Sequence, residues 1–381
     1  MEKQYGDLGN DAEFAAAVVY SACFVRGAHG ERTHGRLHAL VGTSSGALRS
    51  VAMPRVPTTT VAPAAVSSAH AGAVYALSPD RDSDNARIIT GGDDGLARVW
   101  NVASLLDERT DCAKKGAVVS LAAPVRSNRH GATPCVPEVN AARLASEKAW
   151  AACGDGVAVR WDINAQPATP VKSSRASASA AKHALAPLRS WRVDDSLASL
   201  LSLAPVDDVN TFAVGMESAA VGLIDSRTAN GIAARIGLKG ATNVAPPVSA
   251  LCTPALGSDW LYCGMGDGTV AVVSLAAQGV VARVNAWRGG GDDGAGGAVL
   301  SLVPDGNGAV LAAGDSSAVA RVDAASGTAA DALVGLASVS CCPNFALACD
   351  EKSGRVVVGG TNGRLAGFGA LGEHVLTAHC L

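Results

Sequence analysis

Residues Gly42-Thr43-Ser44-Ser45-Gly46 have the G-x-S-x-G spacing of a hydrolase nucleophile elbow. Such an elbow joins a strand to a helix, so that the serine stays exposed beside a histidine and an acid. Here the motif joins two apolar runs of β type, and no histidine and aspartate are arranged around it. We therefore interpret the motif as a turn and expect no enzyme activity from it.

The histidines and cysteines show no metal-binding pattern. His29, His34 and His38 lie within ten residues, but residues 27–36 (GAHGERTHGR) read as a polar loop without a carboxylate or cysteine pattern beside the histidines. The ten cysteines include no C-x-x-C pair, and Cys341 and Cys342 are adjacent. We expect no metal, no cofactor and only reduced thiols, as in an intracellular protein.

A basic segment, residues 165–192, could contact phosphates. It carries Lys172, Arg175, Lys182 and Arg189 and contains no acid. These cations could bind an acidic partner or RNA, weakly and without sequence preference, because Trp191 is its only aromatic residue. The alternative is a solvated loop. The whole chain has 31 basic and 34 acidic residues, so its composition gives no general case for nucleic-acid binding.

The elements around these residues repeat. A turn rich in glycine and small polar residues, flanked by two short apolar runs, occurs seven times, and a third apolar run precedes each pair. Successive turns are roughly 45 to 60 residues apart, close to the period of four-stranded propeller blades with insertions. A fourth strand is weakly encoded, with residues 117–122 and 280–284 as candidates. This pattern predicts an all-β fold, a seven-bladed β-propeller.

The hairpin Ile88–Asn101 resembles a WD repeat, with His70 upstream, Thr90 and Asp94 near its turn, and Trp100 at its end. The resemblance implies a structural hydrogen-bonded tetrad of His70, Thr90, Asp94 and Trp100, which satisfies a buried indole and imidazole. We expect it to be scaffold and not an active site.

The resemblance implies a single WD40-type propeller over residues 1–381. We expect loops at residues 54–68, 104–137, 165–192 and 288–297, which fit no blade. We also expect the two termini to share one blade, completed either from near Asp11 or by residues 373–381. Positions lining the central channel read as mostly Ala, Val and Ser, which gives no nucleophile–base pair.

Ordered stretches of the chain also resemble the THO complex subunit 6 family of propellers. They are residues 69–77, 136–141, 257–264 and 357–368, of which Gly257-Ser258-Asp259-Trp260 is the most similar. The resemblance implies a nuclear, non-catalytic subunit of a THO/TREX-type complex that packages mRNA for export and contacts coiled-coil THO subunits. The alternative is a WD40 scaffold of another assembly, such as a ubiquitin ligase adaptor or ribosome-assembly factor. The chain has neither a signal-like N-terminus nor an apolar run long enough to span a membrane, so we expect a soluble protein.

Overall fold

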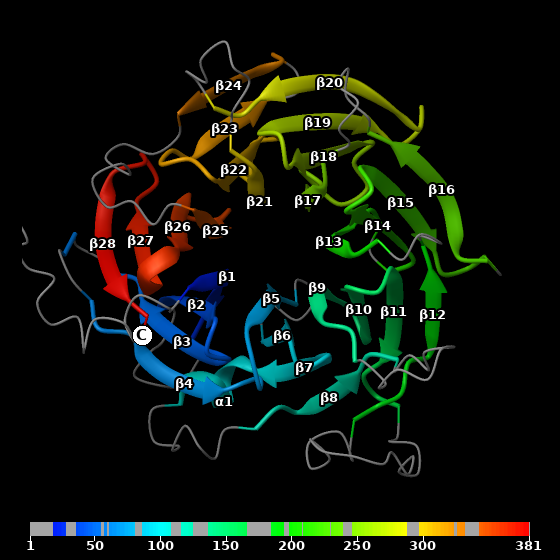
Figure 1. The fold of residues 1–381 in the computed structure, drawn as a ribbon. Helices are drawn as coiled ribbons and strands as arrows, with labels where there is room; N and C mark the ends of the chain where they lie inside the picture. Colours follow the sequence, from blue (N-terminus) through cyan, green and yellow to red (C-terminus); the bar gives the residue numbers. More distant parts are fainter. Residues whose placement is uncertain are drawn as a thin grey trace, which may run out of the picture.

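Seven four-stranded antiparallel sheets stand side by side around a central channel in the computed structural model (Figure 1). The structure describes residues 18–27, 36–54, 57–58, 61–80, 86–107, 116–124, 136–165, 184–193, 198–207, 209–228, 230–238, 246–287, 297–323, 326–331 and 343–380. The fold is the seven-bladed β-propeller that the repeats predict.

Each blade is built from four strands that follow one another in the sequence. Blade one has β1 (Val19–Arg26), β2 (Leu37–Thr43), β3 (Ala47–Ala52) and β4 (Ala64–Ser68); blade two has β5 (Val74–Pro79), β6 (Arg87–Gly92), β7 (Leu96–Asn101) and β8 (Val119–Ala122). Blade three has β9 (Val139–Ala145), β10 (Lys148–Cys153), β11 (Val157–Asp162) and β12 (Arg189–Arg192); blade four has β13 (Leu200–Pro205), β14 (Thr211–Met216), β15 (Ala220–Asp225) and β16 (Ile232–Gly237). Blade five has β17 (Val248–Cys252), β18 (Trp260–Met265), β19 (Thr269–Ser274) and β20 (Gly279–Asn285); blade six has β21 (Val299–Pro304), β22 (Val310–Gly314), β23 (Ala320–Asp323) and β24 (Thr328–Asp331). Blade seven has β25 (Asn344–Asp350), β26 (Arg355–Gly360), β27 (Arg364–Phe368) and β28 (His374–His379). A short helix, α1 (Val102–Leu106), follows β7, and a 3-10 turn, η4 (Thr361–Gly363), joins β26 to β27.

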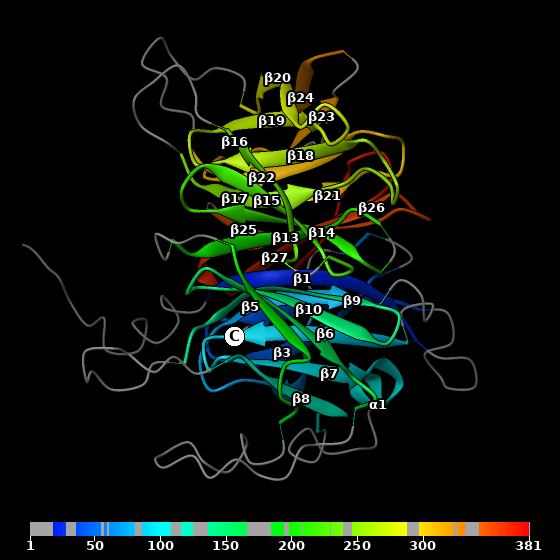
Figure 2. The ribbon, with the colours of Figure 1, turned by 90° about the vertical axis from the view of Figure 1, so that its right-hand side faces the viewer.

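The first strand of each blade lines the channel, and the fourth forms the outer edge (Figure 1). Because the strands alternate in direction, the disc has two distinct faces (Figure 2). The innermost strands begin on one face, which also carries the turns between second and third strands. We call this the upper face. The lower face carries the turns between first and second strands.

The hydrophobic core is divided into seven clusters, each between two neighbouring blades. For example, Val74, Ile88 and Trp100 of blade two pack against residues of blade one, while Ile89, Val99 and Leu121 pack against blade three. The alternation of apolar residues along each strand therefore buries both faces of each sheet, one against each neighbour. Blade-to-blade packing supplies most of the buried apolar area that stabilises the ring.

Small residues on the second strands allow the blades to approach closely. A Cβ at Gly91 of β6 would lie 2.4 Å from Val139 Cγ1 on the next innermost strand. The equivalent position at the closing seam is Gly359 of β26, where a Cβ would lie 2.7 Å from Val19 Cγ1 of β1. Glycine is thus required here by the close approach of the next blade.

Residues 373–381 supply the last strand of the ring, β28, which confirms one of the two expected alternatives. Among the described residues, however, no blade is shared between the two termini, which corrects the rest of that expectation. Blade seven takes all four strands from the C-terminal part of the chain, with β28 as its outer strand, and blade one begins with β1. The seam is held by apolar packing of Val19, Phe24 and Leu37 against blade seven. In addition, the connection before β4 runs beside β28, where Thr58 N donates to Val375 O at 2.8 Å and Val61 N donates to Thr377 O at 3.1 Å.

Three of the four expected loops contain a blade strand, which is a second correction. The two candidate fourth strands are confirmed, because residues 117–122 contain β8 and residues 280–284 lie within β20. Strand β4 lies within residues 54–68, β8 within 104–137 and β12 within 165–192, while α1 overlaps the start of the second segment. Most of residues 288–297 lie outside the described residues. No helix among the described residues is long and apolar enough to cross a membrane.

Candidate functional site

The structure brings His70, Thr90, Asp94 and Trp100 together in blade two. Trp100 Nε1 donates to Thr90 Oγ1 at 3.0 Å, and His70 Nε2 lies 2.8 Å from the same hydroxyl. On the other side of the imidazole, Nδ1 lies 2.8 Å from Asp94 Oδ1. A neutral imidazole that donates from Nδ1 to Asp94 and accepts the Thr90 hydroxyl proton at Nε2 satisfies both ring nitrogens. Arg98 Nη1, which lies 2.6 Å from Nδ1, donates to the Asp94 carboxylate instead.

The pKa shifts of His70 and Asp94 agree with a neutral His70 imidazole. Burial lowers the pKa of His70 by more than the Asp94 carboxylate raises it, so the imidazole is neutral. Burial alone would raise the pKa of Asp94, but hydrogen bonds from His70 and Arg98 hold it well below its ordinary value. Arg98, which we did not single out from the sequence, donates from Nη1 to Asp94 Oδ2 at 2.8 Å. The sequence carried one signal for this contact, since Arg98 lies four residues after Asp94, on the strand that follows the hairpin turn.

The tetrad has no room for a substrate. Thr90 and Trp100 are almost fully buried, and Ala71 N also donates to Asp94 Oδ2 at 3.2 Å, which joins the loop before β5 to the β6–β7 turn. Trp161, at the equivalent position of blade three, donates instead to Ala122 O of blade two at 3.2 Å. Both indoles therefore tie backbone segments together, as scaffold residues do.

A cavity of about 510 Å³ occupies the central channel and is lined by the innermost strands of all seven blades. Near its upper mouth, each innermost strand has a β-bulge that leaves one residue unpaired with its neighbour. The seven bulge residues line the cavity and are half-buried: Tyr20, Tyr75, Asn140, Leu201, Ser249, Leu300 and Phe345.

This lining corrects the expectation of a channel of Ala, Val and Ser. Tyr20 lies edge-to-face against Tyr75, with ring centroids 5.3 Å apart, and against Phe345, with centroids 5.2 Å apart. The three aromatic residues therefore form one cluster across blades two, one and seven. Farther down, Arg143, Asp350 and Lys352 line the lower part of the cavity, so the channel is also more polar than expected.

Carboxylates are numerous on the upper face. Asp93 and Asp94 lie in the turn of blade two, and Asp155, Glu217, Asp267 and Asp315 lie in turns of later blades. Several of them fasten their own blade, since Glu217 Oε2 accepts from Ser199 N and Asp315 Oδ2 accepts from Ala298 N. They are spread around the ring, so they do not form a paired-carboxylate site.

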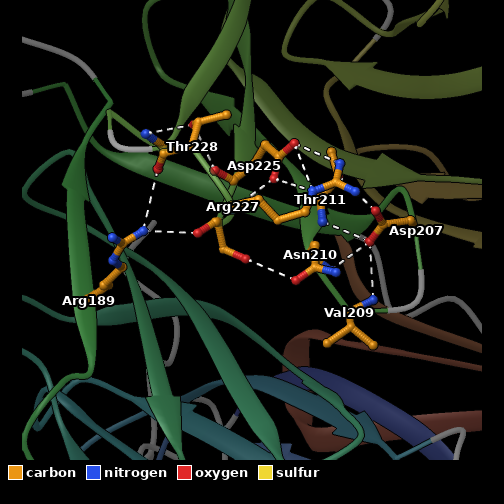
Figure 3. Close-up of polar contacts among 10 residues, drawn as sticks. Arg189, Asp207, Val209, Asn210, Thr211, Asp225, Arg227 and Thr228 are labelled. Atoms are coloured by element: carbon orange, nitrogen blue, oxygen red, sulfur yellow. Dashed lines mark hydrogen bonds and ion pairs between the residues drawn. The ribbon is translucent and has the colours of Figure 1, made fainter.

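On the lower face, aspartates and arginines fix the turns (Figure 3). Asp207 accepts from the backbone N–H groups of Val209, Asn210 and Thr211 and from the Thr211 hydroxyl. Beside it, the Arg227 guanidinium donates to both carboxylate oxygens of Asp225. These contacts have a structural purpose, because they cap the turns of blade four.

Arg189 of the expected basic segment lies at this place. From β12 of blade three its Nη1 donates to Ser226 O at 2.9 Å and to Thr228 O at 3.4 Å in blade four (Figure 3). Arg189 therefore joins two blades. Lys172, Arg175 and Lys182 lie outside the described residues, so an RNA-contacting cluster stays a prediction.

The remaining candidate residues from the sequence, among them residues 42–46, the histidines and Cys23, lie in places where they have structural roles. Residues 42–46 form the turn from β2 to β3, which is not the strand-to-helix geometry of a hydrolase elbow. His38 Nδ1 lies 3.0 Å from Ser50 Oγ, while His29 and His34 fall outside the described residues. No group of metal-ligating side chains occurs among the described residues. Burial raises the pKa of the Cys23 thiol to about 12, which makes it a poor nucleophile.

Comparisons with known proteins agree with this geometry. A family model described as "WD domain, G-beta repeat" matches residues 62–101, the segment that carries all four residues of the tetrad. Among solved structures, the WD40 β-propeller domain of Doa1 is similar, with a TM-score of 0.60, 12% sequence identity and 91% of each chain covered. A search of curated proteins finds no match. The chain therefore carries a WD40 repeat in residues 62–101 and has a seven-bladed β-propeller fold of the WD40 type.

Proposed function

We propose that this propeller is a non-catalytic scaffold subunit of a nuclear THO/TREX-type complex, which couples transcription to mRNA packaging and export. Proteins of WD40 fold serve as protein-interaction scaffolds. The more specific assignment rests on the resemblance of ordered stretches of the sequence to the THO complex subunit 6 family. Its partners are other protein subunits, the coiled-coil THO subunits among them.

The observation that supports a partner surface is the exposure of Trp260. Its side chain is 43% exposed at the start of β18, on the lower face, within the stretch most similar to the THO family. The preceding Asp259 holds this corner rigid, because its carboxylate accepts from Ser274 Oγ at 2.8 Å and from Ala276 N at 2.6 Å. Leu256, in the same β17–β18 connection, is 37% exposed. A fixed, exposed tryptophan is the kind of residue that dominates protein–protein binding energies.

Affinity purification from nuclear extract, followed by mass spectrometry, tests the proposal. We expect THO coiled-coil subunits to co-purify with the wild-type chain and to be depleted with Trp260→Ala. Recovery of a different stoichiometric assembly, such as a ubiquitin ligase or ribosome-assembly particle, would reject the THO assignment and favour the other scaffold hypothesis.

RNA contact is a separate part of the proposal and involves Lys172, Arg175, Lys182 and Arg189. Neutralising all four is expected to weaken RNA binding uniformly across sequences and to reduce its salt dependence. Unchanged RNA affinity and salt slope would leave the segment as a solvated loop.

A further inference from the structure

The aromatic cluster at the upper mouth of the channel has no part in the hydrophobic core. Tyr20, Tyr75 and Phe345 belong to none of the seven inter-blade clusters, and each is half-buried in the wall of the 510 Å³ cavity. Half-buried aromatic side chains in the wall of an open cavity are available to a ligand.

The arrangement of the rings comes from the bulges. Tyr20, Tyr75 and Phe345 are the bulge residues of three neighbouring blades, so the fold places them at one height on one side of the mouth. Tyr20 is the central ring, inclined by 62° to Tyr75 and by 61° to Phe345. All three side chains line the cavity and are only half-buried, so part of their surface is open to the channel, and aromatic rings attract cations.

Carboxylates make this mouth negative. Asp93 N donates to Ala73 O at 3.0 Å, two residues before Tyr75, and Glu138 lies two residues before the bulge residue Asn140 in the cavity wall. Burial raises the pKa of the Tyr75 hydroxyl, and the charges of Asp93, Tyr20 and Glu138 raise it further, in agreement with this placement. Asp93 is exposed in the β6–β7 turn, and Glu138 directly precedes β9. The neighbouring Asp94 differs, because Arg98 and His70 already hold its charge.

We propose that the upper mouth binds a lysine or arginine side chain presented by an extended segment of a partner protein. The cation would lie against the rings of Tyr20, Tyr75 and Phe345, with Asp93 and Glu138 neutralising its charge. An acidic segment would be repelled by the same carboxylates. This site is on the opposite face from Trp260, so it does not depend on which assembly the lower face joins.

The test measures binding of fluorescein-labelled short peptides of alternating glycine and lysine, or glycine and arginine, by fluorescence anisotropy. A glycine–glutamate peptide is the negative probe. We expect both basic peptides to bind and the acidic one not to bind. Binding of all three alike, or of none, would overturn the proposal.

Variants of the full chain separate a ring-lined pocket from general attraction by the acidic face. Tyr75→Leu and Phe345→Leu are each expected to weaken basic-peptide binding roughly three- to thirtyfold, the range of cation–π contributions. Asp93→Asn and Glu138→Gln should also weaken it and reduce its salt dependence. Trp260→Leu and Glu147→Gln, an exposed aromatic residue and an exposed acid on the lower face, are the matched controls and should bind as the wild type does.

Two outcomes contradict the proposal even if binding is found. If the charge variants lose affinity while Tyr75→Leu and Phe345→Leu retain it, attraction is electrostatic only and the rings form no site. If Trp260→Leu lowers affinity as much as Tyr75→Leu, the peptide binds on the other face. Circular dichroism of each variant identifies any that fails to fold. Tyr75→Leu and Phe345→Leu are separate variants of two rings, so either one that folds is enough to decide whether the rings form a site.

Discussion

Individual residues in the tetrad illustrate how one buried hydroxyl can stabilise a blade. Thr90 Oγ1 accepts from Trp100 and bonds His70, which in turn is held by Asp94. Each group is buried, so loss of one leaves a neighbour without its partner, and that costs more than the hydrogen bond itself contributes.

Trp100→Phe removes the indole N–H while leaving an aromatic ring in the core. We expect the free energy of unfolding to fall by about 1–3 kcal/mol, measured by chemical denaturation. Trp260→Phe is the matched control, because that indole is exposed, and it should change stability by less than about 0.5 kcal/mol. Equal effects from the two variants would show that the tetrad bond contributes nothing.

The pH dependence of stability follows from His70. Its pKa in the folded protein is below the ordinary value of 6.5, so the unfolded chain binds this proton more readily. The contribution of His70 is therefore fully present above about pH 6.5 and is lost as the pH falls, and the lowered pKa of Asp94 continues that loss near its ordinary value of 3.8.

Denaturation curves between pH 7 and pH 5 check this prediction. The wild type should lose stability with acidification more steeply than His70→Gln, which has no titrating imidazole at this place. Parallel pH profiles for the two proteins would contradict it.

At the scale of strands, the small residue facing the next blade controls how closely blades pack. Gly91→Ala would bring a methyl group to 2.4 Å from Val139 Cγ1, and we expect it to destabilise the protein by about 1–3 kcal/mol. Val139→Ala removes the Cγ1 methyl group that the new alanine side chain would meet. In a double-mutant cycle, the pair should be less destabilising than the sum of the single changes, and strict additivity would rule out this contact.

The sequence predicted the strands with strong apolar patterns and missed others for physical reasons. The first three strands of each blade are buried on both sides, so their residues repeat clearly. Outer strands such as β12, with its exposed Arg189, Ser190 and Arg192, contact one neighbour only and need little apolar sequence. Strands β4 and β12 were therefore read as parts of loops, whereas β8 and β20 were predicted from residues 117–122 and 280–284.

The sequence did not reveal the cluster of Tyr20, Tyr75 and Phe345 at the upper mouth, because a β-bulge breaks the alternation of side chains along each of these strands. A regular strand would assign Tyr20 and Tyr75 the side opposite to Val19 and Val74, facing a neighbouring blade. The bulge turns them toward the channel instead. An aromatic residue at the second position of three innermost strands, Tyr20, Tyr75 and Phe345, was the signal available.

At the scale of the whole molecule, ring closure depends on contacts between the two ends of the chain. Leu376 of β28 is fully buried among residues of blades one and seven. We expect Leu376→Ala to lower the free energy of unfolding by about 2–5 kcal/mol and the whole ring to unfold together. Calorimetry measures this. Separate melting of blade seven would contradict a cooperatively closed ring.

The lower face of this propeller, around Trp260, is expected to bind another subunit on a rigid frame of blades. Hydrogen–deuterium exchange of the chain alone and within its purified complex measures this. We expect slower exchange in the complex at the β17–β18 connection around Trp260, with the inner strands of the blades slowly exchanging in both states. Identical exchange at that connection in the free and assembled protein would contradict it.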